Sequence, residues 1–245
     1  MNTTEWFVGS ASRSIDPDAR ERTNHAAFAG IASPLMVHAV GFRGEDCLLA
    51  IVVCDVGEPS HIDLSSLRFH INLHPITPVE VIIVASGVCS APAYTATSAT
   101  YQHHVVHAIT DCVIDALTFG CPAVMRVTPD FIQWRKFDEL PIATMSFHQA
   151  GTRLERADYA TLEQHCHAPV LCVTHARAVH QEPLALRIDE LGRAPKQAVT
   201  QVRWQHDAPH WVVTVNEVSI QFGAAQGTPG TGTYVIAREP NEPAR

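Results

Sequence analysis

The stretch that decides the fold begins with LLAIVVCD at Leu48–Asp55 and continues with VEVIIVASGVCSAP at Val79–Pro92. Each part starts with a short apolar run rich in β-branched residues, which favours a buried strand. Between the two runs, Ile62, Leu67 and Ile71 recur at about helical spacing. Strand, helix and strand in this order predict a βαβ unit with parallel strands and a right-handed crossover.

The loops that leave the two predicted strands carry polar and thiol side chains. In an open α/β sheet, the carboxyl ends of parallel strands meet at one edge, and ligands usually bind there. We therefore expect Asp55, Ser86, Cys89 and Ser90 to be neighbours, although about 30 positions separate the first from the others.

A helix is expected next, from Tyr101 to Leu117, with Thr97 or Ser98 as its N-cap. At 100° per residue, one apolar stripe forms along its length, made of Val105, Val106, Ile109, Val113, Ala116 and Leu117. A second stripe on the opposite side carries His103, His104, His107 and Asp111.

The C-terminal third changes character, because apolar and polar residues alternate from Trp211 to Phe222 on both sides of Asn216-Glu217. This pattern predicts an antiparallel hairpin, to which Val202–Trp204 and Tyr234–Ile236 are candidate additional strands. We therefore expect an α/β fold with a mixed or largely parallel sheet, covering helices and antiparallel strands near the C-terminus. Residues 1–245 are expected to form a single domain, with a sub-boundary near residue 195 as the alternative. No internal repeat is visible in the sequence.

Composition excludes several classes of protein. The 245 residues include 17 Lys or Arg and 25 Asp or Glu, giving a net charge of −8, so no basic footprint for nucleic acid is present. No apolar run is long enough for a transmembrane segment. Seven cysteines in mostly apolar surroundings, and the lack of a secretory pattern in the first residues, predict a reduced, cytoplasmic protein.

Several short segments occur in the order and spacing of one known family. They are Val8-Gly9 with Ala11, Ile15-Asp16-Pro17, Gly30-Ile31, Pro34-Leu35, Ala39 preceded by His38, the strand ending at Asp55, and Pro122-Ala123. On these residues, the chain resembles the N-terminal domain of neutral/alkaline non-lysosomal ceramidases over about residues 6 to 137. The resemblance implies that family's fold, and His38 stands where the family has an arginine.

The most diagnostic element of that family, A-T-H-T-H-S-G-P, corresponds to Ala85–Pro92 here. Gly87 replaces the first histidine, which binds the catalytic zinc in the family, and Cys89 replaces the second. The resemblance assigns the second zinc histidine to His180, with His175 as a rival, and gives Arg135 as a weak counterpart of an active-site arginine. A glycine side chain has no donor atom, so the family's zinc chemistry is not expected to be retained.

Two rearranged sites are alternatives. His103, His107 and Asp111 have a spacing that places them on one helical stripe, so His103 and His107, with His180 as a further donor, could hold a relocated zinc ion. Alternatively, Cys89 could be a nucleophile, with His180 or one of the helix histidines as its base and Asp55 orienting that base. In both cases Ser86, Ser90 and Arg135 are candidate binding residues.

Three functions follow from these patterns. We favour a diverged ceramidase-like protein that lacks the zinc amidase chemistry, needs no cofactor and binds a small molecule or a partner protein. The second is an amide-type hydrolase that uses Cys89 or a relocated zinc. The third is a structural subunit, which could form a homo-oligomer.

Overall fold

The computed structural model describes residues 6–24, 26–28, 34–45, 47–57, 61–76, 79–88, 91–127, 131–137, 140–148, 156–174, 176–179, 197–207, 210–222 and 234–236. Two strand-rich units follow one another along this chain. The first contains β1 (Phe7–Ser14), β2 (Met36–Arg43), β3 (Leu48–Cys54), α2 (Leu64–Asn72) and β4 (Glu80–Ala85), with α1 (Ala19–Asn24) and η1 (Ala26–Phe28) between β1 and β2. The second contains β5 (Cys121–Val127), β6 (Phe131–Lys136), β7 (Pro141–His148), α4 (Arg156–Cys166) and β8 (Val170–Thr174).

The predicted βαβ unit is confirmed, because β3 and β4 pair in parallel, with Cys54 opposite Ala85, and α2 connects them. The Asp63 side chain caps α2 by accepting hydrogen bonds from the backbone N–H groups of Ser65 and Ser66. Leu67 and Ile71 of α2 are both buried, as their helical spacing predicted.

The two units share one topology, which the sequence does not reveal. In each unit, three strands pair antiparallel in chain order, and a helix then leads to a fourth strand that pairs in parallel with the third. Strands β1 and β5 join the units edge to edge in antiparallel fashion. With β14 (Tyr234–Ile236) at one edge, the sheet order is β14-β4-β3-β2-β1-β5-β6-β7-β8. The sheet therefore contains both parallel and antiparallel pairs. This is the mixed sheet that was one of the two predicted alternatives.

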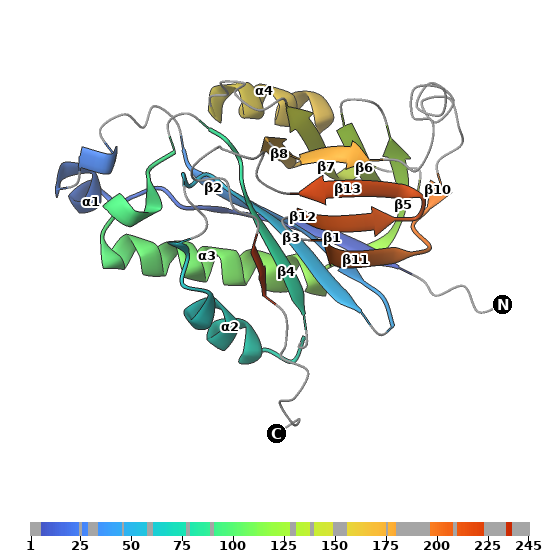
Figure 1. The fold of residues 1–245 in the computed structure, drawn as a ribbon. Helices are drawn as coiled ribbons and strands as arrows, with labels where there is room; N and C mark the ends of the chain where they lie inside the picture. Colours follow the sequence, from blue (N-terminus) through green and yellow to red (C-terminus); the bar gives the residue numbers. More distant parts are fainter. Residues whose placement is uncertain are drawn as a thin grey trace.

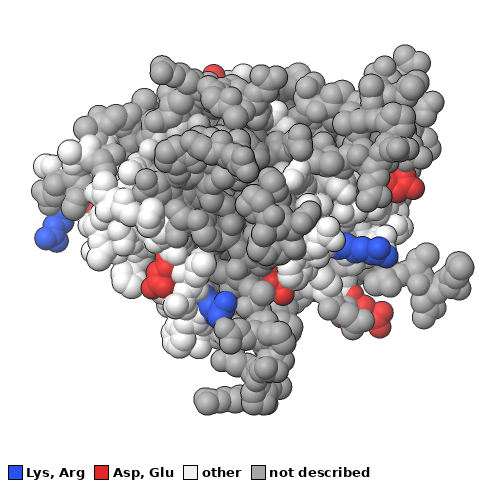
Figure 2. Space-filling model, viewed as in Figure 1, with Lys and Arg blue, Asp and Glu red and all other residues white. Residues whose placement is uncertain are grey.

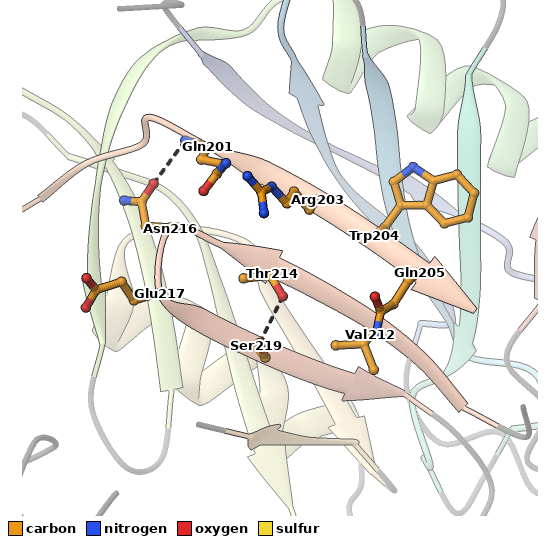
Figure 3. Close-up of a pocket in the computed structure, with 9 residues that line it drawn as sticks. All are labelled: Gln201, Arg203, Trp204, Gln205, Val212, Thr214, Asn216, Glu217 and Ser219. Carbon is orange, nitrogen blue, oxygen red and sulfur yellow. Dashed lines mark hydrogen bonds between the residues drawn. The ribbon is translucent and has the colours of Figure 1, made fainter. Parts of the chain in front are cut away.

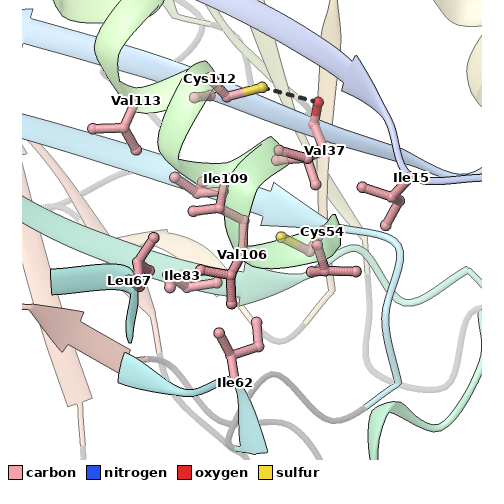
Figure 4. Close-up of a cluster of buried hydrophobic side chains, with 14 of the residues drawn as sticks. Ile15, Val37, Cys54, Ile62, Leu67, Ile83, Val106, Ile109, Cys112 and Val113 are labelled. Carbon is pink, nitrogen blue, oxygen red and sulfur yellow. Dashed lines mark hydrogen bonds between the residues drawn. The ribbon is translucent and has the colours of Figure 1, made fainter. Parts of the chain in front are cut away.

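Helix α3 (Ala99–Thr118) lies between the units in the chain and packs with α2 on one face of β1–β4 (Figure 1). It follows η3 (Tyr94–Ala96) and begins at Ser98, whose hydroxyl accepts a hydrogen bond from the Tyr101 N–H. All six residues of the predicted apolar stripe are buried, and the histidines opposite them are exposed, which confirms this helix. Figure 4 shows the resulting cluster, in which Ile109 and Val113 of α3 face the sheet and the Cys112 thiol donates a hydrogen bond to the Val37 carbonyl.

The other face of β1–β4 packs against the second unit and a four-stranded antiparallel sheet. That sheet has the order β11-β12-β13-β9, formed by β9 (Ala176–Val179), β11 (Val202–Asp207), β12 (His210–Val215) and β13 (Val218–Phe222). One hydrophobic cluster unites Ile51 of β3, Trp134 of β6, Leu171 of β8 and Ile220 of β13. The central strands are consequently buried on both faces, which accounts for their continuous apolar sequences.

The predicted hairpin is confirmed by β12 and β13, with Asn216 at its turn in a left-handed conformation (φ 55°). Val202–Trp204 extends it as expected, because β11 pairs with β12. The placement of Tyr234–Ile236 in this sheet is wrong: these residues form β14, which pairs with β4 in the large sheet. The three apolar residues Tyr234–Ile236 contain too little pattern to specify their partner strand. The short strand β10 (Gln197–Ala198) pairs with β5.

Candidate functional site at the carboxyl end of β3 and β4

The ends of β3 and β4 place Asp55 and Ser86 next to each other. The Ser86 N–H donates to the Cys54 carbonyl at 2.9 Å, so the parallel pairing continues one residue beyond β4. Both polar residues are buried, with exposed fractions of 1% for Asp55 and 3% for Ser86. Asp55 Oδ2 accepts a hydrogen bond from the Met36 N–H at 2.8 Å, and this bond offsets the cost of burying the carboxylate. Asp55 therefore fixes the start of β2 at this edge.

The loop after β4 turns sharply at Gly87, whose φ of 77° lies in the left-handed region that favours glycine. The Ser86 hydroxyl accepts a hydrogen bond from the Val88 N–H at 3.3 Å and closes the turn. The hydrogen bond and the left-handed glycine thus fix the backbone conformation of residues 86–88 directly after β4.

Helix α4 covers this edge from the second unit. Tyr159 is 1% exposed, and its hydroxyl donates to the Ser86 carbonyl at 3.0 Å. The ring also packs in a small apolar cluster with Val88 and Val170. One helical turn later, Glu163 accepts a hydrogen bond from the Val170 N–H at 3.3 Å. These contacts hold α4 between the β4 loop and the start of β8.

A buried histidine lies beside these groups. His38 of β2 is 4% exposed, and its Nδ1 atom lies 2.7 Å from the hydroxyl oxygen of Ser12 on β1. Its Nε2 atom lies 3.6 Å from Glu163 Oε1. A hydroxyl, an imidazole and a carboxylate from three elements therefore form a chain across the packed interior. The sequence analysis did not identify Ser12 or Glu163 as site residues. The only signal in the sequence was His38, an ionisable residue inside the largely apolar strand β2.

Several predicted site residues lie elsewhere or cannot be placed. Cys89, Ser90 and His180 lie outside the described residues, so their predicted roles stay predictions. Arg135 lies in β6 opposite Pro141 of β7, where the strand pairing is irregular.

The predicted metal ligands on α3 lie on the outer side of that helix. Both His103 and His107 are exposed, and the His107 ring packs against His70 of α2 with ring centroids 4.4 Å apart. Within the described ranges, no three His, Cys, Asp or Glu side chains gather closely enough to hold a metal ion. These residues do not by themselves fit a zinc site, which needs three or four such donors.

Thiol and phenol groups lie on the α3 side of the same region. Burial raises the pKa of Cys54 well above its ordinary value and raises that of Cys112 to about 12. It likewise raises the pKa of the Tyr94 phenol to about 12. These groups are therefore neutral near pH 7, and none of them supplies a thiolate or phenolate there.

A hollow lies on the sheet formed by β11, β12 and β13, away from this site (Figure 3). It has a volume of about 460 Å³ and is lined by Gln201, Arg203, Trp204, Gln205, Val212, Thr214, Asn216, Glu217 and Ser219. Part of this polar lining is engaged in internal contacts. The hydroxyls of Thr214 and Ser219 hydrogen-bond to each other at 2.9 Å, and Asn216 Oδ1 accepts from the backbone N–H groups of Thr200 and Gln201.

Figure 2 shows scattered Lys and Arg side chains among the described residues of the face in view. Among all the residues that the structure describes, no helix is both long enough and apolar enough to cross a membrane.

Comparison with solved structures finds the neutral ceramidase from Pseudomonas aeruginosa, at a TM-score of 0.52 and 12% sequence identity. The match covers 78% of this chain and 43% of the ceramidase chain. A ceramidase complexed with C2 matches at a TM-score of 0.47 and 12% identity, over 70% of this chain and 37% of the other. No family model and no curated protein matches the sequence. The expectation of a ceramidase-like fold is therefore confirmed, for a chain that spans less than half the length of the ceramidases it matches.

Proposed function

We propose that this ceramidase-like protein binds a small molecule at the carboxyl end of β3 and β4 and lacks the zinc amidase chemistry of the family it resembles. The observation that carries the proposal is Gly87. The resemblance gives this position to the first zinc histidine, and glycine offers no ligand atom. Its left-handed backbone (φ 77°) is also one that glycine adopts without steric cost, so the local conformation suits the glycine.

The polar groups around Gly87 support a binding role. Ser86, Tyr159, His38 and Glu163 converge between the sheet edge and α4, in a region otherwise packed with apolar side chains. A few directed polar groups within apolar walls are typical of small-molecule sites. A ligand with an apolar body and a hydrogen-bonding end, such as an amide or a carboxylic acid, fits this chemistry.

Metal analysis of the purified chain tests the zinc part of the proposal. We expect substoichiometric zinc, no increase in melting temperature on adding zinc, and no change in either value in the His103→Ala and His180→Ala variants. One zinc ion per chain that is lost in either variant would establish a metalloprotein with relocated ligands and overturn the proposal.

Ligand-observed NMR with an N-octanoyl amide and with octanoic acid tests the binding part. We expect saturation transfer to at least one probe, and weaker transfer in Tyr159→Phe, which removes the hydroxyl that anchors the Ser86 loop. The exposed-residue variant His104→Ala is the control and should bind as the parent does. Transfer to neither probe, with light scattering showing a stable oligomer, would favour the structural-subunit function instead.

A further inference from the structure

The pairing of Ser12 with His38 follows from the strand register. The two residues lie directly opposite each other in the antiparallel pair β1–β2. Side chains at opposite positions project from the same face of the sheet, with Cβ atoms about 5 Å apart. This spacing brings the hydroxyl oxygen of Ser12 within 2.7 Å of Nδ1 of His38. Because both strands lie within the sheet, the geometry of the pair is held by the backbone.

Glu163 reaches the same histidine from the other unit. Its Oε1 atom lies 3.6 Å from Nε2, a distance within the range of an ion pair and longer than a hydrogen bond. The carboxylate is anchored independently, because it also accepts the Val170 N–H. Tyr159 fixes the preceding turn of α4 through Ser86.

The order of these atoms determines where a proton can move. A carboxylate facing Nε2 favours the tautomer in which Nε2 carries the hydrogen, which leaves the lone pair of Nδ1 directed at the Ser12 hydroxyl. A hydroxyl bonded to an imidazole whose other nitrogen faces a carboxylate is the arrangement that activates a serine nucleophile. Burial of His38 strengthens these electrostatic interactions, whereas Ser12 is half-buried and keeps partial exposure.

We propose that Ser12 is a catalytic nucleophile toward small esters, with His38 as its general base and Glu163 as the residue that positions the imidazole. This inference goes beyond the proposed function, because it needs neither zinc nor a ligand held at Ser86.

The reaction balances with water as the only co-substrate. The Ser12 oxygen attacks the ester carbonyl carbon, its proton passes to Nδ1 of His38, and the same proton then passes to the departing alcohol as the ester C–O bond breaks. Water next attacks the acyl-serine and gives a proton to His38. The carboxylic acid is released as the Ser12–acyl bond breaks, and His38 returns the proton to the Ser12 oxygen. An ester suits this site because an alkoxide is a much weaker base, and therefore a better leaving group, than the anion of an amine.

Labelling with a fluorophosphonate probe tests the proposal directly. The probe forms a phosphorus–oxygen bond to an activated serine and loses fluoride, so peptide mapping of the labelled parent chain identifies the residue. We expect the adduct on Ser12, and a burst of p-nitrophenol from p-nitrophenyl acetate equal to one acyl group per chain. His38→Gln keeps a hydrogen-bond acceptor near Ser12 and removes the base, so the labelling rate should fall about 100-fold. Glu163→Gln should lower it about 10-fold, because the carboxylate acts only through the imidazole.

Ser10→Ala is a matched control, since Ser10 is a half-buried serine two residues earlier on β1 whose hydroxyl donates to the Ile142 carbonyl instead of an imidazole. This variant should label at the parental rate. An unlabelled parent chain, an adduct on another residue, or equal labelling of His38→Gln would each overturn the proposal. The first two outcomes are read from the parent chain, so they stand even where His38→Gln fails to fold.

Discussion

Replacing Gly9 with alanine should destabilise the chain strongly, because α3 lies directly on the backbone of β1 at this position. A Cβ atom added to Gly9 would lie 2.2 Å from the carbonyl oxygen of Ala116, and 3.0 Å from Cα of Gly120. Real Cβ atoms essentially never approach closer than 3.0 Å, so strand and helix must separate by at least 0.8 Å, the difference 3.0 − 2.2. The obstructing atoms belong to backbone, which cannot move aside as a flexible side chain can.

The cost follows from the packing of the helix end. Ala116 and Leu117 are 0% and 1% exposed, and a gap of about 0.5–1 Å forfeits a quarter to a half of the dispersion energy of each contact. Overpacking of a filled core typically costs about 1–3 kcal/mol, and a rigid obstruction lies at the upper end, so we expect a loss of about 3 kcal/mol. For a chain of this length, that corresponds to a fall in Tm of about 6–12 °C.

Urea denaturation followed by circular dichroism, together with calorimetric Tm, measures this effect. Gly57→Ala is the control, because its Cβ would meet its closest neighbour, the Pro92 carbonyl oxygen, at 3.2 Å in an exposed loop, and we expect a loss below about 1 kcal/mol. A loss of less than about 1 kcal/mol for Gly9→Ala, or equal losses for the two variants, would refute this account of the contact between β1 and α3.

Leu67→Ala empties a fully buried position under α2 and should cost about 2–5 kcal/mol in urea denaturation, whereas Phe69→Ala on the exposed side should cost little. The two losses would be similar if α2 were not packed as described. Desolvation raises the pKa of Glu80 from 4.5 to about 7, so the folded chain binds this proton more tightly than the unfolded chain does. Stability should therefore fall as the pH rises from 4.5 to about 7, and Glu80→Gln should reduce that fall; an unchanged pH dependence would contradict it. If Cys89 is a nucleophile, iodoacetamide should alkylate it at pH 7 well ahead of Cys112, whose raised pKa suppresses its thiolate; mass spectrometry showing equal rates would remove that role.

The elements that the sequence predicted best are those with long periodic patterns. The apolar stripe of α3 extends from Val105 to Leu117, and the two β-branched runs are continuous. In both cases the apolar pattern alone indicates which side chains are buried. These patterns are local. The parallel pairing of β3 and β4 followed from them because a short helical crossover leaves little choice of topology.

The hydroxyl–imidazole–carboxylate chain could not be predicted in the same way. Ser12 and His38 meet through an antiparallel register that spans 26 positions, and Glu163 arrives on α4, whose amphipathic pattern is weak. The wrong placement of Tyr234–Ile236 has a related cause, since its partner β4 lies about 150 residues earlier in the chain. Pairings that close long loops depend on the whole fold, and no local pattern reports them.

Because the two units share one topology, the large sheet consists of two similarly connected but non-identical halves within one chain. Only Phe119 and Gly120 separate α3 from β5, and the antiparallel contact between β1 and β5 stands where a two-fold axis would pass through a symmetric assembly. In such a fused pair, one half can preserve the scaffold while its counterpart changes, because neither must remain complementary to a copy of itself. The crossover helix of the second half, α4, reaches back to the strand ends of the first, so residues of both halves build the junction where Ser12, His38 and Glu163 meet.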